Sequence, residues 1–314
     1  MHIPDGFLDA KTALATGGLA AAGVSVALRQ ASRQLPARHV PLLGLAAAFV
    51  FAAQMLNFPV AGGTSGHLIG GVLTAVLLGP SAAVIVLASV LIVQCFLFAD
   101  GGVTALGANI FNMGVIGGVA GYAIYRAVRN TFPGTRGVVM AAAFAAWCAT
   151  VLASIVCVGE LAVSGTVAWQ VAFPAMANVH MLVGVGEALI TALVIVAVVR
   201  VRPELLELQA IKGPSYSYGP VIVFGLLISC GLALFVAPFV CSWPDGLDKV
   251  AKTLGFESRA VGQPLLHSPI PEYQLPGISS AAMATSLAGL IGTAVVFALA
   301  FVLARWLVPK TSAE

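Results

Sequence analysis

The first two residues, Met1 and His2, have the donor atoms of a metal chelate. They offer three nitrogens in sequence, which are the Met1 amine, the His2 backbone amide and the His2 imidazole Nδ1. Binding through all three closes two chelate rings in one plane around an ion, provided that the amide loses its proton. Nickel(II) and copper(II) suit such a tetragonal nitrogen site, whereas magnesium and calcium prefer oxygen ligands and zinc prefers a tetrahedron. The alternative is that His2 follows the initiator Met by chance, so the rest of the chain must decide.

The composition places this pair in a membrane protein. Of the 314 residues, 60% are hydrophobic and 9% are charged, which exceeds what a soluble core of this size needs. Apolar segments long enough to cross a bilayer occur at about 12–28, 40–56, 81–99, 104–125, 138–159, 181–199, 220–240 and 281–304, and a shorter one lies at about 67–78. We therefore predict an all-α polytopic membrane protein of about nine spans, in which the short segment crosses in a tilted or partly broken form.

The basic residues support this count and orient the chain. With the N-terminus outside and the C-terminus inside, most of them fall on the cytoplasmic side, as the positive-inside rule requires. These cytoplasmic residues are Arg29, Arg33, Arg38, Arg126, Arg129, Arg136, Arg200, Arg202, Lys212, Arg305 and Lys310. Without the short span, the first three would lie on the opposite side from Arg126, Arg129 and Arg136. A cleaved signal peptide is disfavoured, because residues 1–9 carry two acids and no Lys or Arg.

A second candidate ligand, His67, follows a loop at residues 57–66 that is rich in glycine and contains Pro59. Such a loop allows the backbone to line a cavity instead of facing lipid. The topology puts His67 on the same side of the membrane as Met1 and His2, where it would be the fourth nitrogen of a square plane. Taken alone, His67 is better explained as an interfacial or hydrogen-bonded histidine, and its position on the same side as Met1 and His2 is what favours a ligand.

Polar side chains in the outer halves of the predicted spans are candidates for contacts around this site. They are Gln54, Asn57, Gln94, Asn109, Asn112, His180 and Glu187. Asn109 and Asn112 share a helix face by their spacing, as do His180 and Glu187. A helix-to-helix hydrogen bond is the alternative for each amide, whereas a carboxylate within a span, such as Glu187, is a functional or paired residue by default.

Two Pro-Asp-Gly sequences predict turns on the outer side. The first, at residues 4–6, would reverse the chain just after the chelating pair, so that the N-terminus folds back into its own protein. The second, at residues 244–246, opens a hydrophilic loop that runs to about residue 280, where four prolines limit regular structure. Because His267 is its only histidine, we do not expect this loop to form a binding site.

Several function classes lack their motifs. The sequence has no phosphate-binding loop, no His-Glu-x-x-His zinc motif and no Gly-x-Ser-x-Gly elbow. The five cysteines form no Cys-x-x-Cys pair and are interpreted as small apolar fillers. We therefore expect no enzyme activity and no bound cofactor. A self-sufficient secondary permease for a small solute stays open as an alternative, because broken helices and polar groups at membrane depth also mark those folds.

The first span carries small residues every four positions, at Ala13, Gly17, Ala21 and Ser25. Such a face lets another helix approach closely. It would meet either a partner subunit in the membrane or a helix of the same chain.

Three of these motifs carry a resemblance. Residues 1–8 (MHIPDGFL), the loop at 58–67 (FPVAGGTSGH) and Asn109-Ile110-Phe111-Asn112-Met113, together with His180 to Glu187, resemble the substrate-binding (S) component of nickel/cobalt transporters of the energy-coupling factor class. The likeness covers about residues 1–205. Residues 220–314 resemble the small accessory subunit of those systems, two spans joined by an outer loop at about 241–280, here fused through a cytoplasmic linker at 206–219.

The resemblance implies a function and partners. It implies that the Met1 amine, the His2 amide and imidazole, and His67 ligate Ni²⁺ or Co²⁺ as the transported substrate. It further implies a seven-span binding unit in the plasma (inner) membrane of a prokaryote. This unit would work beside a transmembrane coupling (T) protein and cytoplasmic ATPase subunits, which would hydrolyse the ATP, and with no nucleic acid partner. The fusion favours nickel, cobalt stays open, and coordination chemistry alone does not exclude copper(II).

Overall fold

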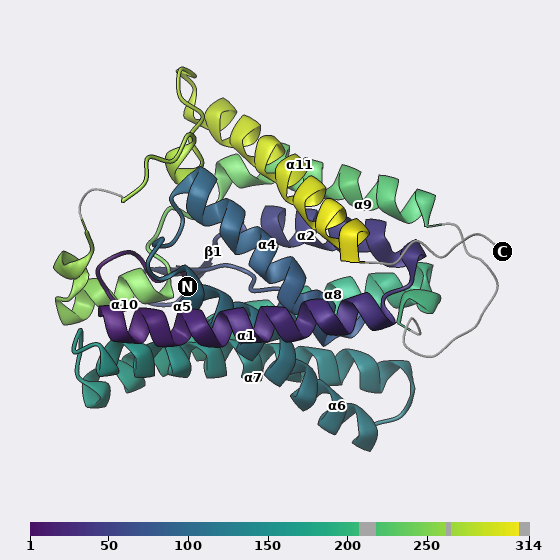
Figure 1. Cartoon of the computed structure of the whole chain (residues 1–314), viewed down its shortest axis with the longest axis horizontal. Helices are drawn as coiled ribbons and strands as arrows, with labels where there is room; N and C mark the ends of the chain where they lie inside the picture. The colour runs from purple at the N-terminus through teal and green to yellow at the C-terminus, as the bar shows by residue number, and fades with distance from the viewer. Residues whose placement is uncertain (207–217, 262–264, 308–314) are drawn as a thin grey trace.

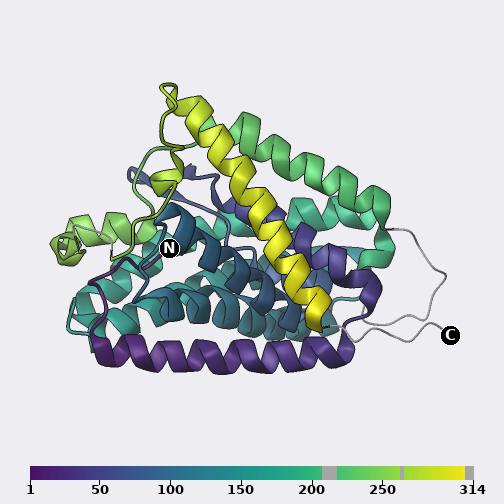
Figure 2. The same cartoon turned by 45° about the horizontal axis from the view of Figure 1, so that its top comes forward.

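The computed structural model describes residues 1–206, 218–261 and 265–307. Figures 1 and 2 show a bundle of long helices that lie roughly along the longest axis of the molecule. Eight helical segments in these ranges are long and apolar enough to cross a membrane. The prediction of an all-α polytopic membrane protein is therefore confirmed. Most of the predicted linker at 206–219 lies outside the described residues.

The α-helices of the described residues follow the predicted apolar segments. They are α1 Ala10–Gln34, α2 Val40–Gln54, α3 Gly71–Leu78, α4 Pro80–Phe98, α5 Leu106–Asn109, α6 Gly121–Thr131, α7 Gly134–Val163, α8 Trp169–Val201, α9 Gly219–Gly231, α10 Gly246–Leu254 and α11 Ala281–Leu307. A π-helical stretch, Ile110–Ala120, joins α5 to α6 within one continuous segment. Strands β1 (Phe58–Val60) and β2 (Thr64–Gly66) form an antiparallel hairpin in which Pro59 lies opposite Ser65.

The short predicted span is only partly helical. α2 and α4 both end beside the loop at 241–273, since Asn57 O accepts a hydrogen bond from Cys241 N and Leu97 O accepts one from Ile270 N. The chain between them must therefore return through the bundle. It returns as the β1–β2 hairpin, an irregular stretch at 67–70 and the eight-residue helix α3. Eight residues of helix span about 12 Å, well short of a bilayer.

Burial separates central from peripheral helices. α4 is apolar on every side, and 78% of the residues in its most apolar stretch are buried within the protein, as expected of a helix in the middle of a bundle. In α1 the corresponding share is 22%, so this helix lies on the outside, along the front of Figure 1. The core beneath the N-terminus is formed by large side chains such as Phe51 and Phe98, both fully buried.

The C-terminal helices pack closely on the rest of the bundle. α11 crosses α2 and α4 diagonally in Figure 1, and α9 lies beside α2. A Cβ added to Gly292 of α11 would lie 2.1 Å from the ring of Phe51, so glycine is needed for this close approach. The two predicted parts of the chain, 1–205 and 220–314, therefore share one interface in the structure.

Several of the basic residues expected on the cytoplasmic side lie at the end of the bundle opposite the N-terminus, whereas Lys11 lies near the start of α1. Arg33, Arg129 and Arg200 are each in the last turn of their helix, whereas Asp9 caps the first turn of α1. This distribution agrees with the expected orientation, N-terminus outside, which stays a prediction.

Candidate metal centre

Residues 1–9, here termed the N-terminal strap, fold back into the bundle. The chain turns at Asp5 and Gly6, and Gly6 adopts a φ of +93°, which favours glycine. Met1, Ile3 and Phe7 are 6%, 0% and 2% exposed. The start of the chain is thus a buried element of the tertiary structure, as the first Pro-Asp-Gly sequence predicts.

Hydrogen bonds hold the strap directly after His2. Asn109 Oδ1 accepts from Ile3 N at 2.8 Å, and its Nδ2 donates to Ile3 O at 3.2 Å. Gly102 N donates to the same carbonyl at 2.8 Å. Asp5 Oδ1 accepts from the backbone N and the hydroxyl of Thr104, at 2.8 and 2.6 Å. Asn109 therefore positions the peptide that follows the candidate chelate.

The strap places its nitrogens against His67. The Met1 amine donates to Nε2 of His67 at 2.5 Å, and the rings of His2 and His67 stack with centroids 5.2 Å apart. Nδ1 of His67 donates to the carbonyl of Leu68 at 3.0 Å. That bond fixes the tautomer in which Nε2 carries the lone pair, as in metal-binding histidines. The Met1 amine and a free imidazole lone pair thus converge on one buried point.

His2 has a partner on each ring nitrogen. Nε2 donates to Gln94 Oε1 at 3.2 Å, and Nδ1 faces Asp100 Oδ1 at 3.2 Å. A neutral imidazole has one N–H, so it can donate to Gln94 or to Asp100 but not to both; the tautomer that donates from Nε2 to Gln94 leaves the lone pair of Nδ1 for a metal. Asp100 is then the group that Nδ1 would exchange for the ion.

The loop that carries His67 is held from within the membrane region. Glu187 on α8 accepts hydrogen bonds from Ile69 N at 2.6 Å and from Gly70 N at 2.9 Å. Gln54 on α2 donates to Ile69 O at 2.9 Å. Glu187 is therefore a paired carboxylate that positions the backbone next to His67, and it does not contact the candidate ligands directly in these hydrogen bonds.

The other predicted polar residues lie at different distances from the candidate metal centre. His180 lines a small cavity of about 10 Å³ together with Met1, His67 and Asp245, while its Nδ1 donates to Met176 O at 2.9 Å. Asn112 instead donates to the buried Glu160 at 2.7 Å. Asn109 and Asn112 thus have different hydrogen-bond partners, and a π-helix begins between them. The structure places Asn57 at the end of α2, where its carbonyl meets Cys241.

Burial and charge favour neutral histidines in this centre. Burial lowers the pKa of His2, opposed by the carboxylate of Asp100. Burial also lowers the pKa of His67, and the adjacent N-terminal ammonium lowers it further. Burial alone would raise the pKa of Asp245, but the ammonium and His67 beside it hold that pKa below its ordinary range. Neutral imidazoles are the form that binds metal.

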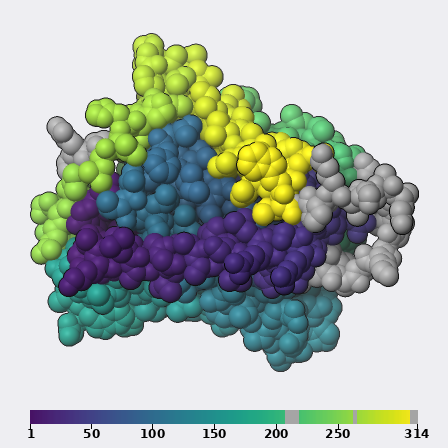
Figure 3. All heavy atoms as spheres, viewed as in Figure 1, coloured from purple at the N-terminus to yellow at the C-terminus, as the bar shows by residue number. Residues whose placement is uncertain are grey.

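The described part of the loop at 241–280 covers this centre, although no binding site was expected there. Asp245 Oδ2 lies 3.0 Å from the Met1 amine, and Tyr273 donates to Asp100 Oδ2 at 2.6 Å. Ser65, two residues before His67, donates through its hydroxyl to Trp243 O and through its N to Pro244 O, at 2.7 and 2.8 Å. In Figure 3 this yellow-green segment meets the purple strap at one end of the molecule. The predicted second turn is wrong, because Asp245 is instead the N-cap of α10.

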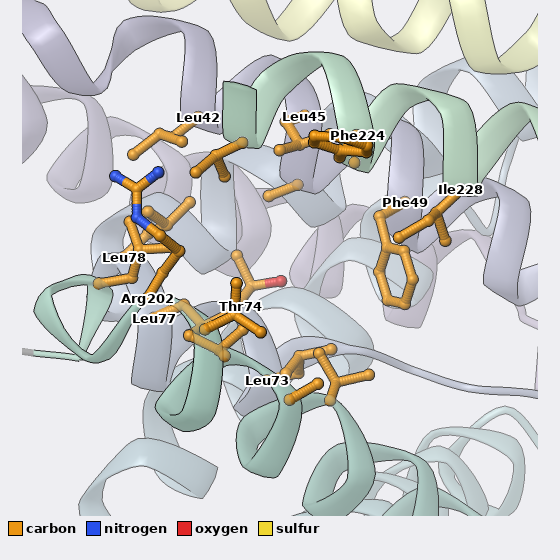
Figure 4. A pocket seen from close by; sticks show the side chains of 18 of the residues that line it. Leu42, Leu45, Phe49, Leu73, Thr74, Leu77, Leu78, Arg202, Phe224 and Ile228 are labelled. Carbon is orange, nitrogen blue, oxygen red and sulfur yellow. The ribbon is translucent and has the colours of Figure 1, made fainter. Parts of the chain in front are cut away.

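Two further observations define what the centre can bind. Among the described residues, no group of three or more His, Cys, Asp and Glu side chains could hold a metal ion. A metal bound at this point would therefore depend on the terminal amine and backbone nitrogen. The larger cavity, about 570 Å³ between α2, α3, α8 and α9, is lined by apolar side chains with Arg202 at one side, and it does not suit a cation (Figure 4).

The small-residue face of α1 is divided. Ala13 and Gly17 are half-buried, and a Cβ on Gly107 would lie 2.4 Å from Gly17 Cα, so this part packs against α5 of the same chain. Ala21 and Ser25 are exposed. Only the second half of the predicted face is free to meet a partner.

Comparisons with known proteins agree with this architecture. A family described as "Cobalt uptake substrate-specific transmembrane region" matches residues 2–205, and a family described as "PDGLE domain" matches residues 219–309. A protein of Archaeoglobus fulgidus that carries the fused nickel transport name NikMN is 37% identical, over 98% of this chain and 99% of its own. The fused nickel transport protein NikMN of Rhodobacter capsulatus is 32% identical, over 95% of each chain.

A solved structure extends the likeness to three dimensions. The crystal structure of a transition metal transporter, 33% identical, matches with a TM-score of 0.60 over 68% of this chain and 100% of its own. The chain is thus similar to metal transport proteins along nearly its whole length. It belongs to the family of cobalt uptake substrate-specific transmembrane regions, here joined to a C-terminal PDGLE domain.

Proposed function

We propose that this chain captures Ni²⁺ or Co²⁺ through the Met1 amine, the His2 amide, the His2 Nδ1 and His67 Nε2. The observation that carries the proposal is the 2.5 Å approach of the buried Met1 amine to a lone pair of His67, with the His2 ring stacked beside it. Metal–nitrogen bonds of about 2.0 Å bring neighbouring ligands into comparable proximity. The positioning roles of Asn109, Gln94, Gln54 and Glu187 follow from the hydrogen bonds that hold the strap and the His67 loop.

The nitrogen-only donor set supports nickel over magnesium, calcium or zinc. The two relatives described above are named for nickel transport, whereas the family description names cobalt. We propose nickel as the physiological ion. Competition between Ni²⁺, Co²⁺ and Cu²⁺ for the purified protein decides among them, and preferential retention of Co²⁺ would overturn the choice of nickel.

Calorimetric titration of the full chain with Ni²⁺ tests the ligand set. His2→Ala should abolish specific binding, because the imidazole anchors the amide. His67→Ala should weaken binding without abolishing it, since water can take the fourth position. His267→Ala is the matched control, because this histidine is exposed and lies outside the centre. Unchanged Ni²⁺ affinity in His2→Ala would refute the proposal.

We further propose that the ion is imported in a complex with a transmembrane coupling protein and cytoplasmic ATPases of the energy-coupling factor class. The support is the family membership together with the exposed small residues Ala21 and Ser25 on α1, a helix that lies outside the bundle. Ala21→Phe should prevent co-purification of the coupling protein. Leu189→Phe, at an exposed position on α8, should not. Nickel uptake by this chain without any ATPase would instead support a secondary permease.

A further inference from the structure

We infer that Asp245, from the C-terminal PDGLE domain, is the counter-ion of the metal chelate and thus a binding residue for the transported ion. The inference rests on the proposed chelate. It assigns to the C-terminal domain a direct part in binding, because residues 1–205 supply the carboxylate of Asp100 beside His2 Nδ1, whereas the carboxylate on the Met1 amine comes from Asp245.

The geometry brings Asp245 to the ligand that no other acid contacts. Its Oδ2 lies 3.0 Å from the Met1 amine, and the two side chains are 16% and 4% exposed. The other oxygen, Oδ1, accepts from Asp248 N at 2.9 Å as the N-cap of α10. This cap fixes the carboxylate, so that one oxygen stays directed at the strap while the other starts the helix.

Several contacts hold this carboxylate in place over the centre. Gly246 packs against His180, where a Cβ would lie 2.7 Å from the imidazole ring. Ser65 binds the two carbonyls that precede Asp245, and Val261 N donates to Asp5 O at 2.9 Å. The domain is therefore attached to the strap, to the His67 loop and to α8 at once, and Asp245 is held by a surface that surrounds it.

The charges balance with and without the ion. In the metal-free form the ammonium carries one positive charge, which Asp245 neutralises. When a divalent ion binds, one proton leaves the ammonium and one leaves the His2 amide. The dication, the neutral amine and the amide anion then sum to one positive charge. The carboxylate of Asp245 therefore offsets one positive charge in both forms, in addition to the carboxylate of Asp100 at His2, and this reduces the penalty of burying the chelate.

The test is Asp245→Asn in the full chain with its native N-terminus. Asparagine has nearly the same shape and is an equally good N-cap, so α10 keeps its start while the charge is removed. Glu257→Gln is the matched control, because it removes a charge from an exposed pair with Lys252 in the same domain. We expect Ni²⁺ affinity to fall at least tenfold in Asp245→Asn, as for loss of one charge-assisted contact, and to stay within threefold of wild type in Glu257→Gln.

A second measurement needs no metal and separates a lost pair from a damaged fold. The N-terminal amine of the folded, metal-free protein is acylated with a succinimidyl ester, and the N-terminal peptide is quantified by mass spectrometry. Asp245→Asn should label several times faster than wild type, whereas Glu257→Gln should not. Wild-type affinity and wild-type labelling in Asp245→Asn, with binding abolished in His2→Ala, would overturn the inference and leave the chelate standing. Wild-type affinity in His2→Ala would overturn both.

Discussion

Adding one glycine before Met1 should destroy high-affinity nickel binding while leaving the transmembrane bundle folded. The insertion moves the terminal amine by about 3.8 Å and turns the nitrogen of Met1 into a peptide amide. The cavity beside Met1 measures about 10 Å³, room for about one water molecule and not for a residue. The strap cannot shift outward to compensate, because its own residues Ile3 and Phe7 are buried in the core.

The expected loss of Ni²⁺ affinity follows from the contacts of the Met1 amine. A peptide amide in its place carries no charge, so the chelate loses both the amine ligand and its charge-assisted contact with the half-buried Asp245, a contact of about 1.5–3 kcal/mol. Loss of the amine ligand also opens one of the two chelate rings. A difference of about 3 kcal/mol already corresponds to roughly a hundredfold in affinity. We therefore expect the Kd for Ni²⁺ to rise by a hundredfold or more.

The assay is calorimetric titration of protein that carries a cleavable N-terminal leader and is purified through a C-terminal tag. Cleavage to Gly-Met-His gives the extended protein, and cleavage directly before Met1 gives the matched control. Thermal unfolding of both metal-free samples verifies the fold. Nickel affinity within threefold of the control, in an extended protein that still unfolds cooperatively, would refute the role of the terminal amine.

Four further outcomes are expected. Glu187→Ala should destabilise the protein by about 2–4 kcal/mol in denaturant titrations, because Ile69 N and Gly70 N lose their acceptor, with Glu187→Gln retaining part of that stability. Gly102→Ala should weaken Ni²⁺ binding, since its Cβ would lie 2.3 Å from Asp5 N, whereas Gly17→Ala, with open space around its Cβ, should bind as wild type does. Tyr273→Phe should keep the ring stacked on Phe98 but lose the hydrogen bond to Asp100. We expect calorimetry to show a loss of about 1 kcal/mol in the free energy of nickel binding. Burial lowers the pKa of His2 below its ordinary 6.5, so the unfolded chain binds more protons than the folded one below that pH. The melting temperature of the metal-free protein should therefore be highest above pH 6.5 and fall as the pH is lowered, and His2→Ala should flatten this dependence.

The membrane fold could be predicted from the sequence because each span has its own local sequence signal. Long apolar segments and the distribution of arginine report each span separately, without knowledge of its neighbours. The short segment before α4 was predicted as broken, and only Gly71–Leu78 of it is helical. The apolar pattern did not predict the β1–β2 hairpin, because its two strands are three residues each and too short to show a strand-like alternation.

The centre itself was predictable where chemistry is concentrated in a few residues. Met1, His2 and His67 were identified by their donor atoms, and the structure brings them together. Asn109, Gln94, Gln54 and Glu187 were identified because polar groups are costly at membrane depth, and each of them contacts the strap or the His67 loop. Asn112 has the same residue type but pairs with Glu160, because a π-helix intervenes.

By itself, then, the sequence determined the class of protein, the course of its spans and the nitrogens that can chelate an ion. Only the tertiary structure decided that Asp245 forms an ion pair with the Met1 amine and that Tyr273 donates a hydrogen bond to Asp100. The physical reason is that an acid or a tyrosine in a hydrophilic loop looks in sequence like any solvated residue. Its role depends on α9 and α11 docking on α2 and α4, which carries the loop between them over the start of the chain.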